Sequence, residues 1–368
     1  MPTSLEPRID PNNRIAFLLD WELTLKCNLN CSYCEVGTYG GHDNSIQHPA
    51  VEDCLQTIDF MFQYVDIYMA AKPRGIRYVI LNVYGGESLH HPKIVEILSA
   101  LHDRYRPYQD RWHLTITTTT NAVVPSQKLK QIIPFIDEFT VSYHTESTPK
   151  QKQQVKSNLL TISASDRRLK CVVLMHSNPE HFEDAKNMIH WLNQNNIKHL
   201  PRQLDHAPDL DFNYNQQQVI WFEKLYKKSL NDAVVKNNKV DLADTGRACC
   251  GGRELCADRD LKKSQKFVYN KFPGWYCSVN EFFVYIKQVT GEIFVNKDCK
   301  MNFDGAVGPI GNLNNIESVL AQARDPNKPI IQCIKNRCVC GLCAPKAKDL
   351  DTYKSIMEKY EIPNNHLL

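Results

Sequence analysis

The sequence predicts an α/β protein, a partial (β/α)6 TIM-like barrel followed by a small cysteine-rich α+β C-terminal domain. Three observations lead to this fold class. Short β-rich runs and longer helical runs alternate six times between residues 15 and 205. Polar and glycine-rich residues gather where the β-rich runs end, and nine of the fourteen cysteines lie after residue 248. Alternation of this kind is typical of parallel strands joined by right-handed crossovers.

The barrel strands are expected, in order, over residues 17–26, 77–85, 112–120, 138–144, 170–176 and 199–205. The helices between them are expected over residues 50–72, 92–104, 125–134, 149–163 and 179–195. Several of these helices carry a proline near the first turn, as in "HPAVEDC" and "STPKQKQQV", which favours a helix start. Six such units predict an open partial barrel rather than a closed eightfold one.

The chain divides into four predicted parts by composition. Residues 15–205 form the predicted barrel, 206–248 a linker with one helix, 249–345 the cysteine-rich domain, and 346–368 a C-terminal helix. The segment "WYCSVNEFFVYIKQVTGEIFVNKDC" predicts a β-hairpin that turns at "VTGE". Because this hairpin follows the sixth strand, we expect it to lie across the open side of the barrel. Further helices are expected over 315–325 and 349–360.

Composition excludes several classes of protein. The chain has 368 residues, 42% of them hydrophobic and 23% charged, which is ordinary for a globular protein. A net charge of +3 and a pI near 8.1 are too mild to indicate binding to nucleic acid or an anionic membrane. No run of 18 apolar residues occurs and the N-terminus lacks a secretory pattern, so we expect a cytoplasmic location.

Fourteen cysteines in a reducing compartment indicate metal binding more than disulfides. Cys54 and Cys171 lie in apolar-periodic segments, and we expect both to be core thiols. Cys27, Cys31 and Cys34 are crowded into "KCNLNCSYCE". A disulfide would leave one of these three thiols over, and a structural zinc site needs a fourth ligand. Three thiolates can instead hold three irons of a [4Fe–4S] cluster and leave the fourth iron open.

The position of these cysteines in the predicted barrel is a second indication of a functional site. They follow the first predicted strand at its carboxyl end, where βα barrels keep their chemistry. The constellation resembles the radical S-adenosylmethionine (SAM) superfamily, whose signature is Cys-x3-Cys-x2-Cys with an aromatic residue before the last cysteine, here Tyr33. The resemblance implies that a reduced cluster cleaves SAM to a 5′-deoxyadenosyl radical, which abstracts hydrogen from an unactivated C–H bond. It also implies an external reductant such as flavodoxin or ferredoxin.

The second strand ends in "YGGES", and Gly85 and Gly86 would let the backbone approach the methionyl group of SAM. By the resemblance, Glu87 accepts hydrogen bonds from the SAM ammonium group. The other implied SAM contacts are Tyr33 beside the adenine, Ser142 at the ribose hydroxyls, and as secondary candidates Asn121 and His144. His144 could equally be a hydrogen-bonded strand-end histidine. Candidates for an acid or base are His144, Glu146 and Asp205.

The tail resembles the SPASM or twitch extension of radical SAM enzymes, which holds one or two auxiliary [4Fe–4S] clusters. The first set of candidate ligands is Cys277, Cys299, Cys340 and Cys343, with Gly291 in the hairpin turn. A second set, with weaker correspondence to the motif, is Cys249, Cys250, Cys256, Cys333 and Cys338. The last four cysteines are spaced four, one and two residues apart, whereas the extension uses two, five and three. The ligand assignment therefore stays open, and zinc is an alternative.

Three classes of function follow. The first is a peptide-modifying maturase, and the second is a dehydrogenase of a small molecule such as a sugar or cyclitol; in either, the auxiliary cluster accepts an electron or binds substrate. The first predicted strand begins by about residue 17, so we expect no N-terminal peptide-docking domain. This favours the second class and leaves open a leader peptide delivered by a separate protein. Ser278 stands where sulfatase-maturing relatives have an aspartate base. The third class, an iron–sulfur electron carrier, needs neither an open iron nor a Gly-Gly-Glu element.

Overall fold

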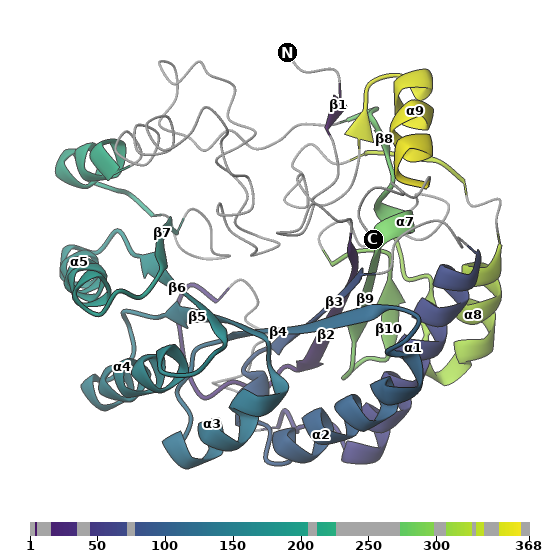
Figure 1. Cartoon of the computed structure of the whole chain (residues 1–368). Helices are drawn as coiled ribbons and strands as arrows, with labels where there is room; N and C mark the ends of the chain where they lie inside the picture. Colours follow the sequence, from purple (N-terminus) through teal and green to yellow (C-terminus); the bar gives the residue numbers. More distant parts are fainter. Residues whose placement is uncertain are drawn as a thin grey trace.

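The structure, a computed structural model, describes residues 4–5, 16–34, 45–71, 78–204, 212–225, 273–297, 307–325, 329–334 and 346–361. Within these residues the larger of two sheets has nine strands, in the order β11-β10-β9-β2-β3-β4-β5-β6-β7 (Figure 1). Six of them pair in chain order and in parallel: β2 (Ala16–Thr24), β3 (Tyr78–Gly85), β4 (His113–Thr120), β5 (Glu138–Tyr143), β6 (Arg168–Met175) and β7 (His199–Gln203).

Helices follow these strands and cover the outer face of the curved sheet (Figure 1). They are α1 (Val51–Ala71), α2 (Ile94–Tyr105), α3 (Ser126–Ile132), α4 (Pro149–Ser163) and α5 (Pro179–Gln194). The predicted partial (β/α)6 barrel is confirmed, and the boundaries differ from the expected ones by a few residues at most. The start of helix α4 could be predicted because its signals are local. Pro149 is its first residue, and Thr148 and Gln151 form a reciprocal capping box.

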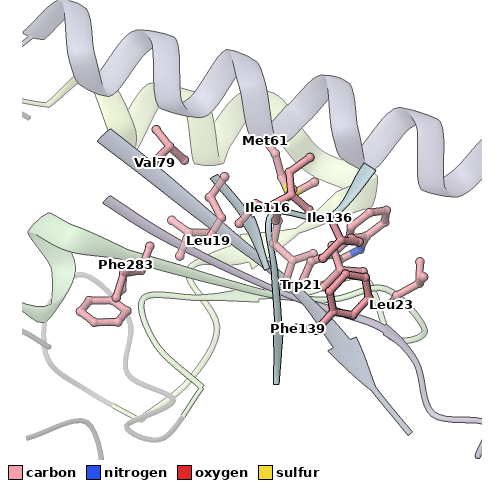
Figure 2. Close-up of a cluster of buried hydrophobic side chains, with 14 of the residues drawn as sticks. Leu19, Trp21, Leu23, Met61, Val79, Ile116, Ile136, Phe139 and Phe283 are labelled. Carbon is pink, nitrogen blue, oxygen red and sulfur yellow. The ribbon is translucent and has the colours of Figure 1, made fainter. Parts of the chain in front are cut away.

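The strands have one apolar face and one polar face. In β2, Leu19, Trp21 and Leu23 alternate toward the helices and pack near Met61 of α1 (Figure 2). The intervening residues, Asp20 among them, point to the opposite, concave face of the sheet. The core thus lies between sheet and helices, where each fully buried leucine contributes about 1.5–3 kcal/mol. Cys54 and Cys171 are fully buried, as expected.

The predicted hairpin forms, but it does not cross the opening of the barrel. β9 (Phe283–Lys287) runs parallel to β2 and pairs with it, and β10 (Glu292–Phe294) and β11 (Gly311–Asn312) follow in antiparallel order. The hairpin therefore extends the sheet beyond its first strand. The physical reason is that β2 would otherwise be an edge strand with unpaired N–H and C=O groups.

Side chains join the hairpin to β2. Tyr285 donates a buried hydrogen bond of 2.8 Å to Glu22, and the Trp21 indole donates one of 2.9 Å to Gln288. The two bonds lie on opposite faces of the sheet, because Trp21 and Glu22 are consecutive residues of one strand. This part of the tail is thus fixed to the barrel on both faces.

The remaining described elements are small. The second sheet is antiparallel, with the strand order β1 (Ser4–Leu5), β13 (Lys346–Ala347), β8 (Tyr276–Cys277) and β12 (Ile331–Gln332). The further helices are α7 (Val279–Phe282), α8 (Ile316–Arg324), α9 (Leu350–Glu361), a helix over 216–225, and the 3-10 turns Ser88–His90, Arg106–Tyr108, Ile133–Phe135 and Leu313–Asn315. In the described part of the chain, no helix has the length and apolar character needed to cross a membrane.

Candidate functional site

The cysteine loop, residues 27–34, leaves the carboxyl end of β2. Its three cysteines are partly exposed and form no disulfide. Burial, with smaller contributions from the nearby Glu87 and Cys34, raises the pKa of the Cys27 thiol to about 11. Burial, followed by Cys27 and Glu146, raises the pKa of the Cys31 thiol to about 12. The three sulfurs therefore lie within one another's electrostatic field, and their thiolates need a cationic group to compensate their charge.

Two asparagines attach the cysteine loop to the end of β4. The Asn28 amide donates to the Val123 carbonyl over 2.6 Å, and the Asn121 amide donates to Asn28 Oδ1 over 2.8 Å. The same Asn121 nitrogen lies 3.8 Å from the Cys27 sulfur, while Asn121 Oδ1 accepts from the Val123 N–H. Asn121 therefore lies at the predicted site, where its side chain supports the cysteine loop. Asn28 was missed from the sequence, although it lies between the first two cysteines.

A left-handed residue shapes the turn behind Asn121. Ala122 has φ of 56°, a conformation that costs a non-glycine residue about 1–2 kcal/mol. Its N–H donates to Thr120 Oγ1, and its carbonyl accepts from the Asn158 amide over 2.8 Å. Asn158, buried in α4, also donates to the Val124 carbonyl. These bonds hold the strained backbone in place, and nothing in the sequence indicates them.

The Gly-Gly-Glu turn at the end of β3 packs against the backbone that leads into the cysteine loop. The Gly86 N–H donates to the Thr24 carbonyl over 2.7 Å, and the Glu87 N–H to the Lys26 carbonyl over 2.9 Å. A Cβ on Gly86 would lie 2.6 Å from the Lys26 oxygen, and one on Gly85 would collide with the Thr24 oxygen. Gly85 also has φ of 147°. The close approach that these glycines permit is therefore to the chain itself.

The Glu87 carboxylate is buried and bridges two strand ends. It accepts hydrogen bonds from Thr120 Oγ1 at 2.7 Å, from the Asn121 N–H at 2.6 Å and from the Leu89 N–H at 3.0 Å. Burial raises its pKa, and the three donors act in the opposite direction. These contacts tie the end of β3 to the end of β4. The predicted contact of Glu87 with a SAM ammonium group stays a prediction.

The end of β5 brings a histidine to the loop. His144 Nδ1 lies 3.2 Å from the Cys31 sulfur and 3.1 Å from the Tyr33 hydroxyl, and the Tyr33 and His144 rings are parallel with centroids 6.0 Å apart. Burial lowers the pKa of His144 to about 4, so the ring is neutral at pH 7. Ser142 lies two residues earlier on the same strand face. Among the described residues no protein group hydrogen-bonds its hydroxyl.

Glu146 contacts the loop between its second and third cysteines. It accepts from the Ser32 N–H at 2.7 Å and from the Ser32 hydroxyl. Behind it lies His176, with Nε2 3.7 Å from Glu146 Oε1 and its ring 5.9 Å from Tyr33. His176 directly follows β6, and this strand-end position is the signal by which the sequence could have revealed it. Asp205, the third acid or base candidate, lies outside the described residues.

Two cysteines of the tail share the small sheet. Cys277 in β8 pairs with Ile331 of β12, and the Cys333 N–H donates to the Trp275 carbonyl over 2.8 Å. On its other side Cys277 pairs with Lys346, three residues after Cys343 in the sequence. Both Cys277 and Cys333 are buried. The other tail candidates lie outside the described residues: Cys249, Cys250, Cys256, Cys299, Cys338, Cys340 and Cys343.

No protein-family model matches the sequence, and neither does any curated protein. Among solved structures, the chain is similar to "Native anSMEcpe with bound AdoMet", with a TM-score of 0.49 and 12% identity over 84% of this chain and 80% of that chain. It is also similar to "Native anSMEcpe with bound AdoMet and Cp18Cys peptide", with a TM-score of 0.48 and 11% identity over 84% and 80%. Similarity at this level carries neither activity nor ligand from those proteins to this one.

Proposed function

We propose that the chain is a radical SAM enzyme whose cysteine loop holds a [4Fe–4S] cluster through Cys27, Cys31 and Cys34. The observation that carries the proposal is the meeting of three free thiols on one loop at the carboxyl ends of parallel strands. Open α/β sheets and barrels bind their ligands at this end. The reaction we propose is hydrogen abstraction from an unactivated C–H bond of a peptide or small-molecule substrate.

Three thiols on one loop are the kind of ligand that iron–sulfur clusters use. Across the described ranges, no three His, Cys, Asp or Glu side chains converge on one position that could hold a metal ion. In a cubane cluster each thiolate binds its own iron, so the sulfurs of a matching ligand set do not meet at one point. The raised pKa values of the Cys27 and Cys31 thiols fit a site that becomes ionised only with a cationic group present.

The chemistry that a bound cluster supplies is the one-electron reductive cleavage of SAM. The chain's residues position the partners. Gly85 and Gly86 pack against the backbone that leads into the cysteine loop. The Ser142 hydroxyl, with no protein partner among the described residues, is the candidate for the ribose. Tyr33, buried against His144, is the candidate to border the adenine. The electron would come from an external reductant such as flavodoxin or ferredoxin.

For the tail we propose an auxiliary iron–sulfur site that includes Cys277, in a domain over residues 249–345. Support comes from the small sheet: Cys277 lies in β8, Cys333 directly follows β12, both are buried, and β13 begins three residues after Cys343. Cys333 came from the second set of candidates. Because its N–H donates to the carbonyl of Trp275, the residue before β8, we propose it as a further ligand beside Cys277. Zinc at the same thiolates is the alternative.

The test is anaerobic reconstitution of the full chain with iron and sulfide. Wild type should be brown and hold more than ~4 irons per chain, since one cubane holds four and an auxiliary site adds more. With dithionite and SAM it should release 5′-deoxyadenosine and methionine. A Cys27→Ala/Cys31→Ala/Cys34→Ala variant should lose this cleavage and keep the iron of the tail. A wild type that binds zinc alone, or a triple variant that still cleaves SAM, would refute the proposal.

A further inference from the structure

Glu146, a distant residue in the chain, makes two hydrogen bonds to one residue of the cysteine loop. Its two carboxylate oxygens accept separately from Ser32, one from the backbone N–H at 2.7 Å and the other from the hydroxyl. Ser32 stands between Cys31 and Cys34, in the two-residue stretch that separates the last two cysteines. One side chain past the end of β5 therefore restrains both the backbone and the side chain of the residue that spaces two candidate iron ligands. Hydrogen bonds to an ionised carboxylate are among the stronger ones in proteins.

The side chain of His176 packs beside Glu146. His176 Nδ1 accepts the Asn178 N–H over 2.8 Å, so the ring proton of the neutral histidine resides on Nε2. Nε2 lies 3.7 Å from Glu146 Oε1, a close approach that is longer than a hydrogen bond. The His176 ring also makes edge contact with Tyr33 at 5.9 Å and with Phe212 at 5.2 Å, which restricts its rotation. The carboxylate is thus flanked by donors from the loop on one side and by an oriented histidine on the other.

This arrangement is unlike that of a general acid or base. An acid–base group needs an oxygen that can face the substrate, whereas both Glu146 oxygens are occupied by Ser32. The Glu146 side chain is 19% exposed, which is too little for a freely moving surface carboxylate. We infer that Glu146, bonded to Ser32 and packed beside His176, is a positioning residue that keeps the cysteine loop in its ligand-ready conformation before a cluster binds. The inference rests on the proposed function for the meaning of "ligand-ready", but the restraint of Ser32 is independent of it.

The test measures amide hydrogen exchange at Ser32 in the cluster-free protein under anaerobic, reducing conditions. Glu146→Ala should speed exchange at Ser32 by about tenfold or more, the equivalent of one lost hydrogen bond to a charged group. Glu146→Gln keeps an acceptor oxygen and should recover part of the protection. Ser32→Ala removes only the hydroxyl bond and should have a smaller effect. Glu183→Gln is the matched control, because it neutralises an exposed carboxylate of α5 that pairs with Lys186.

A second measurement uses the reconstituted protein. The electron paramagnetic resonance spectrum of the reduced cluster should broaden or shift in Glu146→Ala and return toward wild type in Glu146→Gln. A merely structural role would instead speed exchange throughout β5 and β6 and leave the spectrum of the retained cluster unchanged, and that result would overturn the inference. So would Ser32 exchange equal to wild type in Glu146→Ala. If Glu146→Ala does not fold, Glu146→Gln and Ser32→Ala test the inference, again by comparing amide exchange at residue 32 with exchange throughout β5 and β6. A wild type that takes up no iron refutes the proposed function, while the exchange result still decides the restraint.

Discussion

In the cysteine loop, side chains from the ends of β4 and β5 reach the cysteines, whereas Cys277 and Cys333 in the tail are held by backbone pairing and buried in the apolar core. Several polar side chains contact the loop at different residues. Asn121 bonds to Asn28, His144 contacts Cys31, and Glu146 bonds to Ser32. The tail cysteines lie on or beside hydrogen-bonded strands, and their further candidate partners lie outside the described residues. A site that is built from many converging side chains can be formed before its ligand arrives, and a site framed by a few strands depends more on the ligand to complete it.

The largest effect should come from the turn that supports the cysteine loop. Gly86→Ala would place a Cβ 2.5 Å from the Leu25 oxygen, which forces apart the backbone leading to Cys27. We expect a loss of about 3 kcal/mol in the free energy of unfolding, measured by urea titration, together with loss of loop iron. Gly274→Ala is the control, since its Cβ meets nothing within 4 Å and costs only left-handed strain. Equal effects of the two substitutions would contradict the packing seen at Gly86.

The tail should respond in a different way. Cys277→Ala removes a buried sulfur, and we expect a loss of about 1–2 kcal/mol in the free energy of unfolding. Under the proposed function SAM cleavage belongs to the barrel, so it should persist, while iron content should fall and product formation should fail. Cys171→Ala is the matched control, since it removes an equally buried thiol from β6 but no candidate ligand. Retention of all iron in Cys277→Ala would remove Cys277 from the auxiliary site and leave Cys333 as the candidate ligand among the described tail cysteines.

The smallest effect concerns acid pH. Burial lowers the pKa of His48 to about 4, and the neighbouring His91, His90 and Lys26 contribute. Because the ordinary value is 6.5, the unfolded chain takes up a proton before the folded one, so stability is lost as pH falls from about 6.5 to about 4. His48 is partly exposed, so we expect about 1 kcal/mol for it after solvent screening.

The same prediction separates the two regions. His48 contacts Thr24 just before the cysteine loop, whereas the described part of the tail contains no histidine. Amide exchange corrected for intrinsic pH dependence should therefore rise first around the loop. Thermal unfolding of His48→Gln at pH 7 and pH 5 should show a smaller difference than wild type. An identical pH dependence in this variant would show that His48 titrates alike in the folded and unfolded chain.

The strands and helices of the barrel could be predicted because their signals are local. Alternation in β2 and the capping box at Thr148 act over a few residues, so they are visible without the fold. The cysteine loop could be placed at one end of the sheet because the carboxyl ends of parallel strands share an edge. The hairpin was predicted correctly as a hairpin but placed wrongly, since its pairing with β2 depends on which strand edge is free.

The sequence by itself determined the order of the βα units and the presence of three thiols at the carboxyl end of the first strand. Only the tertiary structure decided what surrounds those thiols. Ser32 and Glu146 are 114 residues apart in the chain. The left-handed Ala122, in the turn after β4, accepts a hydrogen bond from Asn158 of α4. Contacts of this kind arise from the packing of the complete sheet, because the free energy that fixes them belongs to pairs of distant residues and leaves no local pattern to read.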